Sequence, residues 1–200
     1  RGDIARLKHG KLRWLGKRDI VVVLGDFGFV WDGSKEEQKK LDWLRKRSYT
    51  LLFLDGAHEN YGLLAQYPVE ERFGGRVQAL GGNVYHVCRG SVLELEGKKY
   101  LFAHAMTSHP DVREEDRYYM RGTMDIDCFF FEGIDGYISM CGHTPTDSIV
   151  WKKDRRYLDE PGNSIWCNDR HNVYLLDCGC GFAGGRLACL CLETKERFYA

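Results

Sequence analysis

The sequence contains no apolar run long enough to cross a membrane. The longest run, residues 187–192, has six residues, whereas a membrane-spanning helix needs about 20. The chain also lacks an excess of charge of either sign, because 29 Lys and Arg residues balance 29 Asp and Glu residues. These two absences argue against a membrane protein and against bulk electrostatic binding of nucleic acid, but they leave room for a local basic pocket.

Cysteine is too sparse for a small disulfide-stabilised scaffold. The 200 residues include eight cysteines, most of them inside apolar stretches such as residues 137–141. This pattern predicts reduced thiols and a cytoplasmic protein. The chain also lacks internal repeats and low-complexity linkers, and its length is that of one domain. We therefore expect residues 1–200 to form a single domain.

The first half of the chain alternates between helix-like and strand-like segments. Ser34 and Glu37 form a capping-box pattern that predicts a helix running to about Arg47. Residues 20–24 and 50–54, on either side of it, are short apolar runs. Such runs are typical of strands that are buried on both faces of a parallel sheet.

The second half is richer in strand-like segments. Residues 173–176 and 186–193 fit a closing hairpin around a Gly-rich turn. Alternating elements followed by strands predict an α/β fold with mixed sheets. The other short strand-like runs lie between glycines or next to them: 84–88, 91–95, 99–104 and 137–141.

A further helix is expected close to the start of the chain, over residues 3–15, with Asp3 as its cap. A parallel β-α-β crossover needs a strand before its helix. Either the fold begins in an unusual way, or its first strand precedes Arg1 and is missing from this sequence.

Four of the predicted strands are followed by a polar side chain that is a candidate ligand. Asp26 follows the first run and His58 follows the second, whereas His104 and His143 follow strands of the second half. Ligands of open α/β sheets bind at the carboxyl ends of the strands, so we expect these side chains to gather around one cavity. One carboxylate and three imidazoles suit Mn, Fe, Zn or Ni rather than Ca.

The order of these motifs resembles that of the calcineurin-like metallophosphoesterases. Residues 100–105 and 142–146 look most like the phosphoprotein-phosphatase branch of that family. Residues 25–31 and 55–60 look like uncharacterised bacterial metallophosphoesterases. The resemblance covers nearly the whole chain and implies a four-layer α/β/β/α sandwich. The motifs that carry it are Gly25-Asp26, Gly56-Ala57-His58-Glu59, His104 and Gly142-His143.

The resemblance also implies an activity and a role for each residue. Asp26 would bridge two divalent transition-metal ions (Mn, Fe, Zn or Ni), and His104 and His143 would hold the second of them. A metal-bridging hydroxide would attack a phosphate monoester, which is a phosphoprotein or a small phosphorylated compound. His58 would protonate the leaving oxygen as general acid. The Gly-His-Thr-Pro segment that starts at Gly142 favours a phosphatase over a nuclease.

Three departures from the family pattern affect the expected site. The Asp-x-His motif of the first metal site is absent and would precede Arg1. The Asn that binds the second metal in the family is replaced by Ala57, which has no donor atom. Phe29 and Val30 replace the Asp-Arg pair of the phosphatase branch. Arg121 is therefore a candidate for binding the substrate phosphate.

Two other functions remain open. The chain is a binding protein of the same fold if the loss of donors at Ala57 and before the first residue has impaired catalysis. It is a zinc-stabilised interaction protein if its paired thiols bind a structural metal. Cys-x-Cys spacing is shorter than usual for zinc and puts both side chains on one face of a strand, so a core hairpin explains it more simply. The four thiols are Cys178, Cys180, Cys189 and Cys191.

Overall fold

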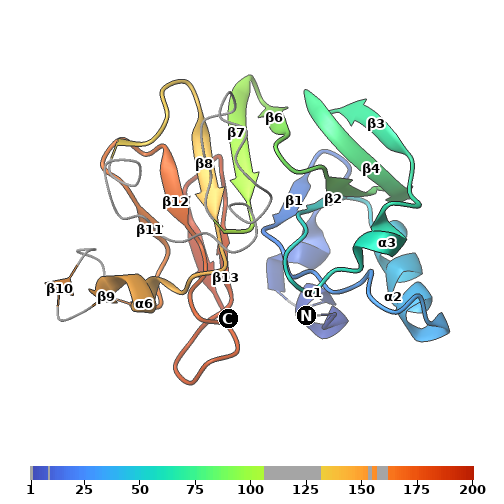
Figure 1. The fold of residues 1–200 in the computed structure, drawn as a ribbon, viewed down its shortest axis with the longest axis horizontal. Helices are drawn as coiled ribbons and strands as arrows, with labels where there is room; N and C mark the ends of the chain where they lie inside the picture. Colours follow the sequence, from blue (N-terminus) through green and yellow to red (C-terminus); the bar gives the residue numbers. More distant parts are fainter. Residues whose placement is uncertain (1, 9, 106–131, 153–154, 157–161) are drawn as a thin grey trace. The chain divides into compact units, whose positions relative to one another are not determined.

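The computed structural model describes the chain except for residues 1, 9, 106–131, 153–154 and 157–161. The chain divides into two compact units, residues 1–91 (unit 1) and residues 92–200 (unit 2) (Figure 1). Each unit contains a five-stranded mixed sheet, so the predicted α/β class with mixed sheets is confirmed. A search of the described residues finds no helix that is both long and apolar enough to cross a membrane.

The sheet of unit 1 has the strand order β1-β2-β5-β4-β3. β1, β2 and β5 are parallel to one another, and β4 and β3 continue the sheet in antiparallel fashion. The strands expected at 20–24, 50–54 and 84–88 are therefore confirmed, and their carboxyl ends share one edge of the sheet. The bounds are β1 Ile20–Val23, β2 Thr50–Phe53, β3 Val69–Arg72, β4 Gly75–Gly81 and β5 Val84–Val87.

The expectation that β1 and β2 are each buried on both faces is correct for β2 and wrong for β1. In β2, Leu51, Leu52 and Phe53 are fully buried. In β1, Ile20 is 38% exposed and the other residues are half-buried. β1 is the edge strand of this sheet, so it has a neighbouring strand on one side only.

The described part of unit 1 contains three short helices and one longer helix. The prediction of one continuous helix over residues 3–15 is wrong. The chain forms an α-helix and then a 3-10 helix, and Gly10, which begins the latter, has a φ of +66° that an α-helix does not tolerate. Asp3 does accept a hydrogen bond from the N–H of Ala5 (3.0 Å), as expected of a cap. The bounds are α1 Ile4–Lys8, η1 Gly10–Trp14, α2 Lys35–Arg45 and α3 Tyr61–Leu64.

The helix α2 begins where the capping pattern placed it. The Ser34 hydroxyl accepts a hydrogen bond from the N–H of Glu37 (3.1 Å). The carboxylate of Glu37 accepts from the N–H groups of Trp31 and Gly33, in the loop before the helix. Leu44, on the inner face of α2, is fully buried in a core that also contains aromatic residues of the sheet and of the loop after β1.

The hairpin of β3 and β4 was not anticipated from the sequence. Its two turn residues, Phe73 and Gly74, both have positive φ (55° and 77°), as in a type I′ turn. Phenylalanine is not a residue that such turns favour, and so the local sequence carried little signal for it.

The sheet of unit 2 has the order β11-β12-β8-β7-β6. β12, β8 and β7 are parallel, with an antiparallel strand at each edge. The strands expected near 91–95, 99–104, 137–141 and 173–176 are confirmed. The bounds are β6 Val92–Leu95, β7 Lys98–Ala103, β8 Ile138–Cys141, β11 Trp166–Cys167 and β12 Val173–Leu175.

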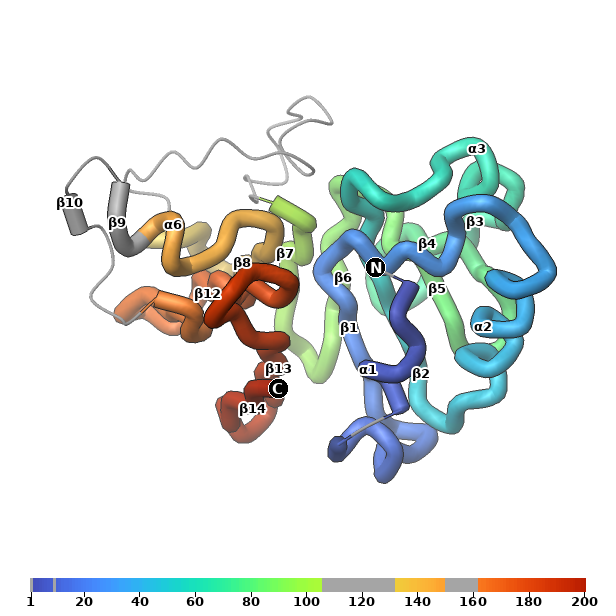
Figure 2. Tube along the Cα trace, turned by 90° about the horizontal axis from the view of Figure 1, so that it is seen from below, coloured from blue at the N-terminus to red at the C-terminus, as the bar shows by residue number. Residues whose placement is uncertain are grey.

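The closing hairpin predicted between 173–176 and 186–193 is wrong. β13 (Ala188–Leu190) pairs with β14 (Arg197–Tyr199) instead (Figure 2). β12 has no free edge for it, because β8 and β11 occupy its two sides. The remaining elements of unit 2 are the helix α6 (Thr146–Val150) and the two-stranded ladder of β9 (Trp151–Lys152) and β10 (Arg155–Arg156).

Candidate functional site

Asp26 lies just beyond the carboxyl end of β1 in a left-handed backbone conformation. Gly25 has a φ of 91° and Asp26 a φ of 50°, and a non-glycine residue of this kind typically costs about 1–3 kcal/mol. Its Oδ1 accepts hydrogen bonds from the N–H groups of Ala57 (2.8 Å) and His58 (3.2 Å). The loop that follows β2 is thus attached to the carboxylate that follows β1.

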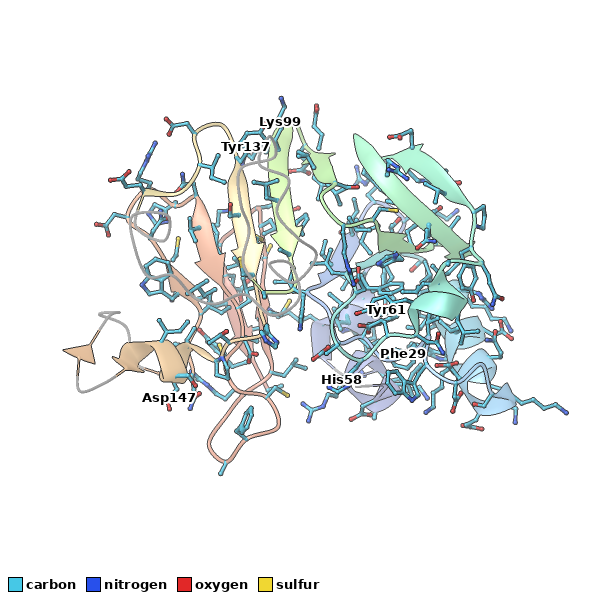
Figure 3. All side chains as sticks on the ribbon, viewed as in Figure 1. Phe29, His58, Tyr61, Lys99, Tyr137 and Asp147 are labelled. Atoms are coloured by element: carbon cyan, nitrogen blue, oxygen red, sulfur yellow. The ribbon has the colours of Figure 1, made fainter. Side chains whose placement is uncertain are left out.

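These contacts bring His58 beside Asp26, as the sequence predicts. Nε2 of His58 lies 3.9 Å from Oδ2 of Asp26, and the two side chains are 42% and 34% exposed. The ring of Trp31 lies edge-on to the imidazole, with 6.4 Å between ring centroids. His58 and Tyr61 both belong to the segment after β2 (Figure 3). Both members of this pair therefore remain accessible to a ligand.

Glu59 fastens the same loop from inside the protein. Its Oε1 accepts a hydrogen bond from the N–H of Gly28 (2.8 Å), and its Oε2 accepts from the N–H of Gly56 (2.6 Å). The side chain is buried, and this burial is the main reason that the pKa of Glu59 is raised; the charges of Asp26 and Asp55 add to it. Glu59 thus links the loop after β1 to the loop after β2.

Asp55, directly after β2, is the centre of a buried polar network. Its carboxylate accepts hydrogen bonds from Nε of Arg89 (2.6 Å) and lies 2.8 Å from Nε2 of His86. Nδ1 of His86 lies 2.7 Å from Oε1 of Gln78. Burial raises the pKa of Asp55, but the hydrogen bonds and positive charge of His86 and Arg89 outweigh it and hold that pKa below its usual value. The guanidinium of Arg89 also stacks 4.8 Å from the ring centroid of Tyr61.

Sequence reasoning gave no role to Asp55, Glu59 or Arg89. The available signal was weak: a histidine at position 86 inside a strand whose four residues are all buried. A buried imidazole needs hydrogen-bonding partners. The partners themselves are identified only by the pairing of β2 with β5, which places Phe53 opposite His86.

In unit 2, His104 and His143 come together at the ends of neighbouring parallel strands. Ala103, the last residue of β7, is opposite Cys141, the last residue of β8. The N–H of Gly142 donates to the carbonyl of His104 (2.9 Å). The two imidazole centroids are 4.7 Å apart, with 55° between the ring planes. His104 is buried and His143 is exposed, and His143 has a positive φ of 64°.

The sequence predicts that all four side chains gather around one cavity, and the structure shows two pairs: Asp26 with His58 in unit 1, and His104 with His143 in unit 2. Within the described ranges, no group of three or more His, Cys, Asp or Glu side chains is arranged to hold a metal ion. Arg121 lies outside the described residues.

Among the residues that the structure describes, the four paired thiols are not grouped as a zinc site would require. Cys178 is buried, Cys180 and Cys189 are exposed, and Cys191 is half-buried. They are also not part of any metal-binding group among the residues that the structure describes. The hairpin that was expected to bring these two segments together does not form, because β13 pairs with β14. Burial raises the pKa of the Cys178 thiol to about 11, which disfavours the thiolate that a metal would need.

Three comparisons with known proteins were made, and no family model, no curated protein and no solved structure matches this chain.

Proposed function

We propose that the chain is a calcineurin-like metallophosphoesterase that hydrolyses phosphate monoesters of proteins or of small compounds. The observation that supports this is the grouping of polar side chains at the ends of parallel strands: Asp26 with His58, and His104 with His143. These residues stand where the family pattern has its metal ligands and its general acid. Asp26 and His143 also share a left-handed backbone, and such strain in non-glycine residues is concentrated at functional sites.

The donor atoms fit a transition metal. Asp26 offers a carboxylate that is one-third exposed, and the rings of His104 and His143 lie next to each other. Carboxylate oxygen and imidazole nitrogen together suit Mn, Fe, Zn or Ni. Ala57 takes the place of the Asn ligand in the family pattern. Its side chain is a methyl group, so it contributes no donor atom to the metal.

Each residue then has a defined task. Asp26, His104 and His143 would hold the metal ions, which when bound supply positive charge and activate water. His58 would give a ring proton to the leaving oxygen as the P–O bond breaks. Oδ2 of Asp26, 3.9 Å from Nε2 of His58, is close enough to attract the protonated imidazole and to restrict its orientation.

The proposal extends to the fold. We assign the two mixed sheets to the two inner layers of an α/β/β/α sandwich. Support comes from the three adjacent parallel strands that each sheet contains. A crystal structure in which the two sheets do not stack face to face would contradict the assignment.

The test of His58 compares two phosphate esters in the presence of Mn²⁺. p-Nitrophenolate leaves without protonation, whereas phenolate needs a proton, so His58→Ala should slow phenyl phosphate hydrolysis by about 10²–10⁴-fold and p-nitrophenyl phosphate hydrolysis much less. His171→Ala, which removes an exposed histidine of unit 2, should leave both rates unchanged. Equal losses on the two esters would show that His58 is not the general acid.

The missing donor at position 57 gives a gain-of-function test. If Ala57 occupies the place of a ligand, Ala57→Asn should raise Mn²⁺-stimulated turnover at limiting Mn²⁺ by at least about tenfold. The matched control is Ala65→Asn, which adds the same side chain at an exposed position after α3. Metal titration would be followed by turnover and, independently, by isothermal titration calorimetry. No change in Mn²⁺ affinity would contradict the assignment.

Ala57 also favours a second candidate, a binding protein of the same fold that has lost catalysis. The N–H of Ala57 donates to Asp26, but its side chain offers no donor atom to a metal. A metal site that includes Asp26 is therefore weaker than one with a ligand at position 57. If the protein binds a phosphorylated compound but turns over neither ester with Mn²⁺, and Ala57→Asn restores turnover, the binding function is supported. The absence of both binding and turnover would contradict both candidates.

A further inference from the structure

A small cavity in unit 1 lies apart from the strand-end residues, between the N-terminal helices and α2. Its volume is about 170 Å³, similar to the roughly 150 Å³ of an apolar cavity that accommodates benzene. Leu7 of α1, Leu12 of η1 and Leu15 contribute apolar side chains to it, and Trp43 of α2 lines it as well. A cavity of this size and composition suits one compact apolar group.

Three cations also line the cavity: Lys8, Arg13 and Arg47. Cζ of Arg47 lies 4.0 Å from the ring centroid of Trp43, and Nζ of Lys8 lies 5.4 Å from it. Among the described residues, none of these three cations forms an ion pair with a carboxylate. No acidic side chain lines the cavity, so its local charge is strongly positive although the chain as a whole is neutral.

Tyr49 is the third feature that points to a ligand. Its side chain lines the cavity and is 97% buried, and its hydroxyl forms no hydrogen bond within the described part of the chain. The neighbouring Ser48 hydroxyl, by contrast, donates to the carbonyl of Leu15 (2.8 Å). A buried hydroxyl without a partner costs about 1–3 kcal/mol, and a small movement of the Tyr49 side chain that let the hydroxyl meet an acceptor atom of a ligand would recover this.

We propose that this cavity binds a small organic anion with a compact apolar body, such as an aryl carboxylate. The apolar body would contact the three leucines, and the carboxylate would meet the guanidinium of Arg47 and the ammonium of Lys8, with the Tyr49 hydroxyl as a further donor. This is a second ligand site, separate in residues and chemistry from the proposed phosphoesterase site. It does not depend on that activity.

The test titrates the metal-free protein with sodium benzoate and follows the indole N–H signal of Trp43 by NMR, assigned with Trp43→Phe. For a ligand of about nine non-hydrogen atoms, we expect saturable binding with a dissociation constant on the order of 1 mM. Benzyl alcohol, which lacks the charge, and acetate, which lacks the ring, should each bind at least about tenfold more weakly. Equal responses to all three compounds, or a response that does not saturate, would overturn the proposal.

Substitutions separate the parts of the site. Arg47→Gln should weaken benzoate binding about tenfold, and Tyr49→Phe about fivefold without loss of folding, because it removes an unsatisfied hydroxyl. Lys39→Met, an exposed lysine of α2 that does not line the cavity, is the control for lost charge and should bind as the parent does. If Arg47→Gln unfolds, Lys8→Met replaces it. Parent-like affinity in the lining variants would refute the site and leave the hydrolysis proposal unaffected, because no metal or ester is present.

Discussion

In unit 1, carboxylates at the strand ends accept hydrogen bonds from the backbone of the neighbouring loop, whereas in unit 2 two histidines at strand ends lie against each other. Asp26 accepts from two N–H groups of the loop after β2, and Glu59 accepts from one N–H group in each of two loops. His104 and His143 owe their proximity to the register of β7 and β8. Charge therefore positions the first grouping, and sheet geometry positions the second.

In both units, nevertheless, a candidate site side chain follows a glycine and has a positive φ. Each of the strands β1 and β8 is followed closely by a glycine and then by a non-glycine residue with positive φ, Asp26 (50°) or His143 (64°). Asp and His tolerate this conformation better than β-branched residues do. The comparison indicates that the backbone turn defines where the side chain goes, and that the surrounding hydrogen bonds define how rigidly it is held.

Among the substitutions that compare the two units, one that breaks the buried charge network of unit 1 should lower the free energy of unfolding most. Asp55→Asn leaves Arg89 and His86 facing a neutral amide in a buried site, where the Asp55 side chain is 3% exposed. We expect the free energy of unfolding to fall by about 3–5 kcal/mol. Urea denaturation followed by circular dichroism measures it.

The control for that prediction lies in unit 2, where Arg170 and Asp135 form an ion pair with side chains that are 51% and 85% exposed. Asp135→Asn should cost less than about 1 kcal/mol, because water screens the pair. Similar losses for the two variants would mean that burial of the charge is not what distinguishes the units.

Two glycines test how tightly each unit is packed around a turn. Gly82, between β4 and β5, has a φ of +58°, and a Cβ there would lie 2.4 Å from the carbonyl oxygen of Arg45. Gly136, before β8, has a φ of +81° with nothing within 4 Å. Gly136→Ala should therefore cost only the backbone strain, about 1 kcal/mol. Gly82→Ala adds a clash with backbone and should cost about 3 kcal/mol in total. Equal costs in urea denaturation would show that the end of α2 moves freely.

Much of the fold followed from local patterns. The β-branched run at 20–24 and the apolar run at 50–54 have few alternatives to being strands, and the Ser34 cap marks the start of α2 because its hydroxyl has one evident partner. The hairpin at β13 could not be predicted in the same way. Its partner depends on which edges of the sheet are already occupied, and this is a tertiary property that adjacent sequence does not encode.

The candidate site was likewise predicted where the signal is local and missed where it depends on strand order. Gly-Asp and Gly-His after strands indicated where Asp26 and His143 leave the sheet. The network of Asp55, His86 and Arg89 was missed because β5 pairs with β2 across 30 residues of intervening chain that include β3 and β4. Hydrogen bonds between residues so far apart arise only from the strand order.

The smallest of these effects is a pH dependence that distinguishes two buried carboxylates of unit 1. Burial raises the pKa of Glu59, so its stabilising contribution is complete below about pH 4.5 and is lost as the pH rises through its folded-state pKa. The difference in unfolding free energy between the parent and Glu59→Gln should therefore decrease as the pH rises, by at most about 1.4 kcal/mol for each unit of pKa shift.

For Asp55, whose pKa is lowered, the contribution is present above about pH 3.8 and is lost as the pH falls. The difference between the parent and Asp55→Asn should thus increase as the pH rises toward about 3.8 and stay level above it, in a lower pH range than the change at Glu59. Urea denaturation at a series of pH values tests both signs, and slopes of the same sign would contradict the opposite roles of hydrogen bonding and burial at the two carboxylates.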